Sequence, residues 1–375
     1  MAKRTHGATE PSVQVTLQVR LAPNVTPDDG LFVAGNLPAL GDWQPAAVAL
    51  PRVGPRLFAL TFAAPIGKPV EFKITRGTWK SQAIYLDPAG RFPPDNRVIV
   101  PTRDQRVEVT VIDWLDRIAL AVDPVVGDLR RHEPMSGPGL REPRAIQVWL
   151  PPSYASRPER RYPVLYMHDG QNLFDPATSF CGQDWKVDEV ATRLITEGRL
   201  RELIVVAIDN TGDRMEEYNL ARPRGRAYAT FLIEVVKPFI DRTYRTLPEP
   251  EQTGVMGSSM GGLISFQLAW TFPEIFGLAG CLSSAFYKAW AATTRLVRGN
   301  PASGRRLRLY FDAGELEPPI ATCFHKMQSL LREVGLQPGR EFLAHFAPGA
   351  THSERAWSDR LHLPLEFLFG SPSGR

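Results

Sequence analysis

The stretch T-G-V-M-G-S-S-M-G-G, from Thr253 to Gly262, decides the fold of this chain. It contains the pattern G-x-S-x-G, with Ser259 at its centre and a glycine two positions to either side. A β-like run, Gln252–Met256, precedes the pattern, and a helical run, Leu263–Thr271, follows it. An ordinary glycine- and serine-rich turn is the alternative, but a strand before and a helix after favour a nucleophile elbow. In an elbow, Ser259 is strained and its hydroxyl stands above the edge of a sheet.

Strands and helices alternate on both sides of this elbow, from Arg144 to the end of the chain. Such alternation is typical of the α/β class, a mostly parallel sheet with helices on both faces. Ligands of these sheets bind beyond the carboxyl ends of the strands, where Ser259 is expected to lie. The predicted strands are 146–150, 164–167, 203–208, 252–256, 278–282, 307–311 and 342–346, and the predicted helices are 184–197, 228–244, 263–271, 320–334 and 353–368.

The first part of the chain, residues 12–112, shows a different pattern. Short alternating runs separated by Pro/Gly turns predict an all-β, immunoglobulin-like antiparallel sandwich. Residues 113–143 carry prolines, glycines and charges with little periodicity and are interpreted as a linker. The predicted domains are therefore 12–112, a linker at 113–143, and an α/β domain at 144–370. The expected sandwich strands are 13–21, 31–35, 57–63, 70–75, 97–100 and 106–112.

The composition of the chain excludes several kinds of binding partner. The 375 residues carry a net charge of +4, and no Lys/Arg run alternates with aromatic residues, so no nucleic-acid partner is expected. Three cysteines are too few and too widely spaced for a disulfide framework or a zinc site, and no metal or cofactor is expected. Residues 1–11 are polar and no apolar run could span a membrane, which predicts a cytoplasmic protein, or a secreted one whose leader has been removed.

A serine hydroxyl becomes a nucleophile only when a base accepts its proton. His352 fits this role, since it follows the last predicted strand in the sequence P-G-A-T-H-S. The other six histidines lie at the N-terminus, in the linker, upstream of the elbow, within helices or within a strand: His6, His132, His168, His325, His362 and His345.

The acid that orients the histidine should follow the strand at 307–311, where the chain offers Asp312, Glu315 and Glu317. The oxyanion hole needs two N–H donors. Met260 supplies one directly after the nucleophile, and Gln171 is expected to supply the other, after a tight turn at Gly170.

Several motifs in order resemble one family. V-L-Y-M-H-D-G-Q-N-L-F-D, I-D-N-T-G-D-R, G-S-S-M-G-G and G-A-T-H, within residues 144–370, are similar to the Putative esterase family of α/β-hydrolases. That family includes enterochelin-type esterases, feruloyl esterases and S-formylglutathione hydrolases. The resemblance implies a triad of Ser259, His352 and Glu317, the acid lying three residues after Gly314, with oxyanion donors at Met260 and Gln171. This chain has H-D-G where the family often has H-G-G or H-G-x, and Glu where many members have Asp.

The N-terminal region resembles a second family. L-F-V-A-G-N-L-P-A-L-G-D-W, E-F-K-I-T-R-G-T-W and D-N-R are similar to starch-binding carbohydrate-binding modules, in which two tryptophans stack on glucose. Trp43 matches the first tryptophan. The second is replaced by Arg91 and Phe92, with Trp79 and Tyr85 as substitutes at other places. Trp43 is thus either a glucan contact or a core or interdomain residue, and any glucan contact is expected to be weak.

The sequence therefore predicts a serine carboxylic-ester hydrolase that forms an acyl-enzyme on a bulky, aromatic, or sugar- or siderophore-linked ester. Asn172, Asn210 and Phe286 are the expected substrate contacts, and the aromatic-rich segment 285–302 is either a partial lid or ordinary packing. An acyltransferase would share every residue of this site. A glucan-binding adaptor with an idle hydrolase domain is the alternative outside enzymes.

Overall fold

The computed structural model describes residues 11–26, 30–85, 96–118, 124–300 and 307–371. The chain divides into two compact units. The first comprises Met1–Ala121 together with Phe180–Gly182, and the second comprises Val122–Ser179 together with Gln183–Arg375. Within the described residues, no helix is both long enough and apolar enough to cross a membrane.

The first unit is the expected β-sandwich, and its two sheets enclose a core in which Val15, Leu17 and Val19 are fully buried. One expectation needs correction, because the first and last strands, β1 and β9, pair in parallel. The long connection between them allows a parallel pairing that a hairpin could not make. The sheets are β4 (Arg52–Gly54), β5 (Leu57–Pro65), β1 (Ser12–Leu21), β9 (Gln105–Trp114) and β7 (Ala83–Tyr85), and β3 (Val48–Ala49), β2 (Phe32–Gly35), β6 (Val70–Thr75) and β8 (Arg97–Ile99).

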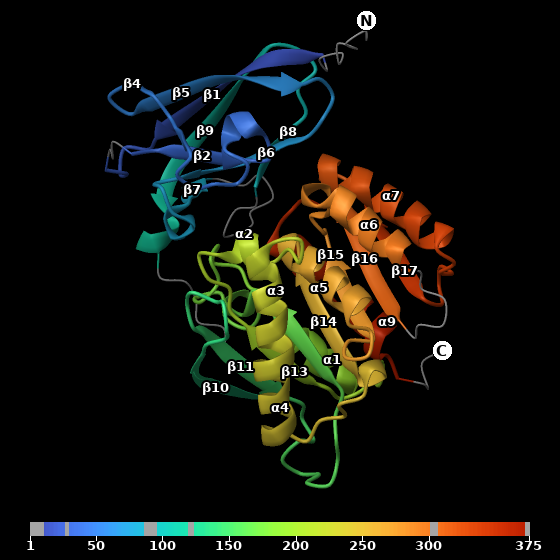
Figure 1. Cartoon of the computed structure of the whole chain (residues 1–375). Helices are drawn as coiled ribbons and strands as arrows, with labels where there is room; N and C mark the ends of the chain where they lie inside the picture. Colours follow the sequence, from blue (N-terminus) through green and yellow to red (C-terminus); the bar gives the residue numbers. More distant parts are fainter. Residues whose placement is uncertain (1–10, 27–29, 86–95, 119–123, 301–306, 372–375) are drawn as a thin grey trace, which may run out of the picture. The chain divides into compact units, whose positions relative to one another are not determined.

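An eight-stranded sheet forms the centre of the second unit (Figure 1). The first two pairings, β10 with β11 and β11 with β13, are antiparallel, and all the others are parallel. The strands in spatial order are β10 (Asp128–Met135), β11 (Arg144–Leu150), β13 (Ile204–Ile208), β12 (Val164–His168), β14 (Thr253–Ser258), β15 (Leu278–Leu282), β16 (Arg308–Gly314) and β17 (Phe342–Ala347).

Strand β10 corrects the interpretation of residues 113–143 as a linker. Asp128–Met135 pairs with β11 at the edge of the sheet, with an irregular register between His132 and Met135. Its sequence is charged and contains a proline. Edge strands tolerate both features because only one side of the backbone must pair.

Apolar side chains of the central strands point alternately to the two faces of the sheet, which explains why helices cover both faces. In β12, Val164 and Tyr166 point into one core, whereas Leu165 and Met167 point into the other. The first face packs against α3 (Pro223–Thr230), a π-helical segment (Phe231–Val236), α4 (Lys237–Thr243), α5 (Met260–Thr271), α6 (Trp290–Gly299) and α7 (Pro318–Glu333). The second packs against α1 (Val187–Thr196), α8 (Glu354–Arg360) and α9 (His362–Phe369) (Figure 1).

The parallel strands position the site. Because β14, β15, β16 and β17 are parallel neighbours, the loops that follow them open at the same edge of the sheet. Ser259 follows β14, Ser283 follows β15, Glu317 follows β16 and His352 follows β17. Residues separated by almost a hundred positions in sequence thus meet at one end of the sheet.

Candidate active site

Ser259 forms the strained turn between β14 and α5. Its φ of 56° and ψ of −117° lie in a region that residues other than glycine rarely adopt. Three hydrogen bonds hold the turn: its N–H donates to the carbonyl of Leu282 (3.0 Å), and its carbonyl accepts from the N–H groups of Leu263 (3.1 Å) and Ala285 (2.9 Å). The side chain is half-buried. The chain therefore maintains an unfavourable backbone conformation at the residue predicted to be the nucleophile.

Glycine is required beside this serine because strand and helix touch there. A Cβ atom on Gly257 would lie 2.9 Å from the carbonyl carbon of Gly261, closer than real Cβ contacts. The N–H of Met260 is the first of α5, and the first N–H groups of a helix have no partner within it. This N–H is available as an oxyanion donor next to Ser259.

Glu317 and His352 are in direct contact. The Nδ1 atom of His352 lies 2.6 Å from Oε1 of Glu317. An ionised carboxylate can only accept, so Nδ1 carries the proton and Nε2 is the unprotonated ring nitrogen, the one that can act as a base. Glu317 is buried, whereas His352 remains partly exposed, with 18% of its side chain accessible.

Backbone hydrogen bonds hold together the loops that carry Glu317 and His352. The N–H of Glu315 donates to the carbonyl of Ala347 (3.0 Å), and that of Leu316 donates to the carbonyl of Ala350 (3.1 Å). A Cβ on Gly314 would lie 2.3 Å from the carbonyl oxygen of Ala350, so only glycine permits this approach. The N–H of Gly314 also donates to Oε2 of Glu317.

Asp312, the competing candidate for the acid, is occupied elsewhere. Its carboxylate accepts two hydrogen bonds from Arg360, one from Nε (2.8 Å) and one from Nη2 (3.1 Å), and also accepts from the hydroxyl of Tyr310 (3.0 Å). Burial opposes the charge on Arg360, but Asp312 outweighs it and raises the pKa of Arg360. Asp312 therefore braces the core beneath the site, while Glu317 reaches the histidine. Glu315 accepts from the N–H of Gly349 (2.9 Å) on an exposed loop.

The loop predicted to hold the second oxyanion donor lies after β12. Gln171 is in the short 3₁₀ turn Gly170–Asn172, and its Oε1 accepts from the N–H of Asn210 (3.2 Å). The left-handed residue of the turn is Asp169, with φ of 60°, so a left-handed backbone is not the reason for glycine at position 170. Gly170 is needed for another reason: a Cβ there would lie 2.7 Å from the N–H nitrogen of Ile208.

Asp169 is clamped by Arg214. Nε and Nη2 of Arg214 each lie 2.7 Å from a different oxygen of Asp169, and Nδ2 of Asn210 donates to Oδ1 (2.5 Å). Burial alone would raise the pKa of Asp169, but Arg214 and Asn210 outweigh it and lower that pKa. A Cβ on Gly261 would lie 3.2 Å from Oδ2 of Asp169. The clamped carboxylate of Asp169 therefore lies beside the first turn of α5.

Residues 137–366, more than half of the chain, match the family model described as Putative esterase. The chain belongs to the Putative esterase family. Residues 12–108 match the Starch binding domain model, so the N-terminal sandwich is a domain of that type. Family and fold together support a carboxylic-ester hydrolase.

Proteins similar to this chain differ widely from it in sequence. Uncharacterized protein YbbA of Bacillus subtilis is 24% identical over 245 residues, covering 60% of this chain and 93% of the relative. An endo-1,4-beta-xylanase/feruloyl esterase of Xylanibacter ruminicola is 28% identical over 147 residues, which span 38% of this chain and only 20% of that protein.

Two solved structures share the fold. A ferulic acid esterase has a TM-score of 0.53 at 21% identity and covers 65% of this chain and 98% of its own. The enterobactin esterase FES from Shigella flexneri has a TM-score of 0.55 at 16% identity and covers 97% of this chain and 95% of its own. At these identities the likeness shows the fold alone.

In this member of the Putative esterase family, the residues expected to contact substrate lie mostly inside the protein. Asn172 is buried, and the side chain of Asn210 is bound to Asp169. Phe286 is only 2% exposed and packs edge-on against Phe266 at 5.4 Å between ring centroids, as a core residue does. Two large apolar side chains nearby in sequence are exposed instead, Met215 (43%), five residues after Asn210, and Tyr287 (37%), directly after Phe286.

The N-terminal domain brings two tryptophans together. The rings of Trp43 and Trp79 have centroids 6.3 Å apart and planes tilted by 41°, and both side chains are half-buried. Of the two substitutes considered for the second stacking ring, Trp79 is thus the neighbour of Trp43, whereas Tyr85 is buried. Arg91 and Phe92 lie outside the described residues.

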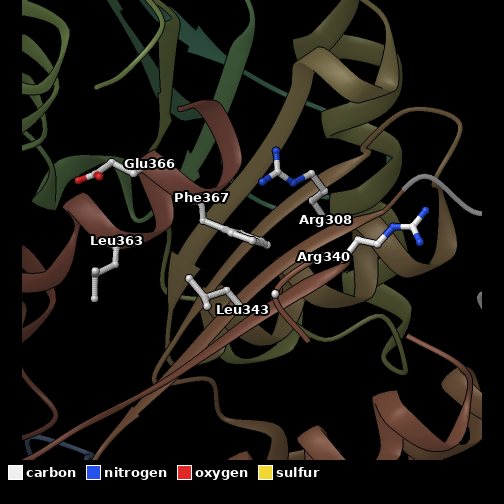
Figure 2. A pocket seen from close by; sticks show the side chains of 7 residues that line it. Arg308, Arg340, Leu343, Leu363, Glu366 and Phe367 are labelled. Carbon is white, nitrogen blue, oxygen red and sulfur yellow. The ribbon is translucent and has the colours of Figure 1, made fainter. Parts of the chain in front are cut away.

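A pocket of about 680 Å³ lies in the second unit, and Figure 2 shows the side chains that line it. Arg308 begins β16, so the pocket opens toward the amino ends of the strands, opposite to Ser259. The guanidinium of Arg308 lies 4.6 Å from the ring centroid of Phe367, and Leu343 and Leu363 add apolar walls. Across the described ranges, no group of three or more His, Cys, Asp or Glu side chains could hold a metal ion.

Sequence reasoning missed four residues that support the site. Arg214 lies within the I-D-N-T-G-D-R motif, so a signal for its importance was present, although not for its partner. Ser283, Trp357 and Arg360 carry no local signal. The hydrogen bonds that Ser283 accepts from Trp357 and Arg360 join positions more than 70 residues apart in sequence.

Proposed function

We propose that this protein is a serine carboxylic-ester hydrolase that forms an acyl-enzyme, with Ser259 as nucleophile, His352 as base and Glu317 as the orienting acid. The observation that carries the proposal is the 2.6 Å contact between His352 Nδ1 and Glu317 Oε1, on loops that follow β16 and β17 at the same edge of the sheet as the Ser259 elbow. Asp312, which is bound by Arg360, is not available for the role.

Acylation follows from the tautomer of His352. With Nδ1 donating to Glu317, Nε2 accepts the proton of the Ser259 hydroxyl while the oxygen attacks the ester carbonyl carbon. The carbonyl π-bond becomes an oxyanion, which the N–H groups of Met260 and Gln171 stabilise. His352 then gives its proton to the departing alcohol oxygen as the C–O bond breaks, leaving the acyl group on Ser259.

Deacylation repeats the same steps with water. Nε2 of His352 accepts a proton from the water whose oxygen attacks the acyl carbon. Collapse of the second oxyanion breaks the bond to Ser259, and His352 returns the proton to the Ser259 oxygen. The carboxylic acid leaves, and the reaction as written involves no redox step and no external cofactor.

A bulky or aromatic ester suits the exposed apolar side chains near the site. Met215 follows β13, and Tyr287 follows β15, so both extend from the carboxyl edge of the sheet that carries Ser259. The ammonium of Lys288 lies 5.2 Å from the ring centroid of Tyr287 and adds a positive charge beside it. Aromatic and siderophore-linked esters are also consistent with the names of the two structural neighbours, the ferulic acid esterase and the enterobactin esterase.

The test compares two adjacent serines on a panel of aryl, feruloyl, acetyl-sugar and siderophore esters. Ser259→Ala should lower kcat at least about a thousandfold on every ester that the wild type hydrolyses, given the losses typical of triads. Ser258→Ala, at a buried strand position, should keep most of the activity. Equal activity of all three proteins would refute the assignment, and transfer of the acyl group to an added alcohol in preference to water would favour an acyltransferase.

A weak glucan contact at Trp43 is the second candidate function, favoured by the starch-binding type of the N-terminal domain and by the ring of Trp79 beside it. Because the two rings are tilted by 41°, they cannot both lie flat on one extended sugar face. One stacking ring contributes on the order of 1 kcal/mol, whereas a millimolar Kd already needs about 4 kcal/mol, so the affinity should be millimolar at best when few other contacts help.

A further inference from the structure

We infer that Ser283 is a positioning residue of the triad, whose hydroxyl proton is directed onto Glu317 by Arg360 and Trp357. This inference rests on the proposed function and adds a residue to it. Ser283 follows β15, is fully buried, and does not contact His352 in any described hydrogen bond. Its effect on catalysis would therefore pass through Glu317.

The direction of the Ser283 proton follows from its partners. Its Oγ lies 3.0 Å from Nε1 of Trp357 and 2.7 Å from Nη2 of Arg360. An indole N–H and a guanidinium can only donate, so these two bonds occupy the lone pairs of the hydroxyl oxygen. The hydroxyl proton is left to donate to Oε2 of Glu317, 2.9 Å away.

The two oxygen atoms of the Glu317 carboxylate have different partners. Oε2 accepts from the Ser283 hydroxyl and from the N–H of Gly314, and Oε1 faces Nδ1 of His352. A glutamate has one more rotatable bond than an aspartate, so it loses more side-chain freedom when it is held in place. Ser283 and Gly314 supply the anchor that this longer acid needs.

Ser283 is itself held in an unusual backbone conformation. Its φ of 39° lies in the left-handed region, and its N–H donates to Oδ1 of Asp312 (2.8 Å). Asp312 also binds Arg360, so the strained backbone, the carboxylate and the guanidinium fix one another. Such strain persists where the surroundings over-determine a residue, as at functional sites.

Trp357 connects the same hydroxyl to the base. Its ring lies edge-on to the ring of His352, with centroids 4.9 Å apart and planes at 90°, while its N–H is donated to Ser283. One side chain therefore packs the imidazole and helps orient the proton that holds the acid. Ser283, Trp357 and Arg360 form a support that reaches both Glu317 and His352.

The experiment measures kcat and KM of Ser283→Ala on an aryl ester, alone and in a Glu317→Ala background. Loss of the anchor should lower kcat about 10- to 100-fold, as small misplacements of catalytic groups do, with KM within about twofold. In the Glu317→Ala background the same substitution should have almost no effect, because its partner is gone. Ser284→Ala is the matched control: that serine is buried, and its hydroxyl has no hydrogen-bond partner among the described residues.

Trp357→Phe keeps an aromatic ring beside His352 but removes one hydrogen-bond donor to Ser283. This variant tests the same inference if Ser283→Ala fails to fold. It should lower kcat several-fold in the wild-type background and not in Glu317→Ala. Wild-type kcat in both variants, or losses that add in full to that of Glu317→Ala, would overturn the inference. If the wild type and Ser259→Ala hydrolyse esters equally, the proposed function itself fails, which is a separate result.

Discussion

Replacing Glu317 by glutamine changes one atom of the side chain, and the structure determines which way the amide must point. The Oε2 position receives two donors, the Ser283 hydroxyl and the Gly314 N–H. The carbonyl oxygen of glutamine must occupy this position, because an NH₂ group there would face two donors. The NH₂ group is then directed at Nδ1 of His352, where the wild type has a carboxylate oxygen at 2.6 Å.

This orientation predicts a large loss of rate with little loss of structure. Facing an NH₂ group, Nδ1 must become an acceptor, so the imidazole proton moves to Nε2, which can no longer take the proton of Ser259. An acid-to-amide change that selects the wrong tautomer lowers kcat on the order of 10⁴-fold, or about 5 kcal/mol in the activation barrier.

Asp312→Asn is the matched control for this substitution. It weakens a buried ion pair with Arg360 and should cost about 3 kcal/mol in the free energy of unfolding, while His352 keeps its partner. The assay is kcat on an aryl ester together with urea unfolding for both variants. A loss of about 10⁴ in kcat for Asp312→Asn, with Glu317→Gln within tenfold of the wild type, would refute the reasoning and transfer the acid role to Asp312.

Three further predictions concern the surroundings of the site. Burial lowers the pKa of His168 from 6.5 to about 4, so between these pH values the unfolded state binds a proton that the folded state does not. The free energy of unfolding, measured in urea titrations, should therefore fall by about 2 kcal/mol from pH 7 to pH 4.5 relative to that of His168→Asn. A difference between the two proteins that does not depend on pH would contradict this. Arg214→Met removes the ion-pair partner of the Asp169 carboxylate and should cost about 3–5 kcal/mol of stability by thermal unfolding, with reduced kcat in the protein that remains folded. Unchanged melting would show that the clamp is unimportant. Titration of the full chain with a linear glucan, followed by tryptophan fluorescence, should give no saturation below the millimolar range, whereas micromolar binding abolished by Trp43→Ala would show a full carbohydrate-binding site.

The elbow could be predicted from sequence because its physics is local. Gly257, Ser259 and Gly261 lie within five residues, and the need for glycine at a close strand–helix contact appears directly in the pattern. The parallel sheet could be predicted as well, since its strands are nearly continuous apolar runs. Strand β10 could not, because an edge strand with one neighbour tolerates charges and a proline that resemble a linker.

The triad acid and the residues that hold it in place could be identified only from the structure, for a different reason. Asp312, Glu315 and Glu317 are equivalent as carboxylates within six residues, and only the position of Arg360 removes Asp312 from the choice. Arg360 is 48 residues from Asp312 and 77 residues from Ser283, and nothing in the local pattern of α8 connects it to either. Contacts between loops of neighbouring parallel strands depend on the sheet order, which a single sequence does not contain.

The central claim, that Ser259 is the nucleophile of an acyl-enzyme mechanism, is tested most directly by covalent labelling. The intact protein is treated with a fluorophosphonate, digested and examined by mass spectrometry while ester hydrolysis is followed in parallel. We predict one adduct per chain, on Ser259, forming at the same rate as activity is lost and absent from Ser259→Ala. An adduct on another residue that accompanies the loss of activity, or undiminished inactivation of Ser259→Ala, would contradict the assignment.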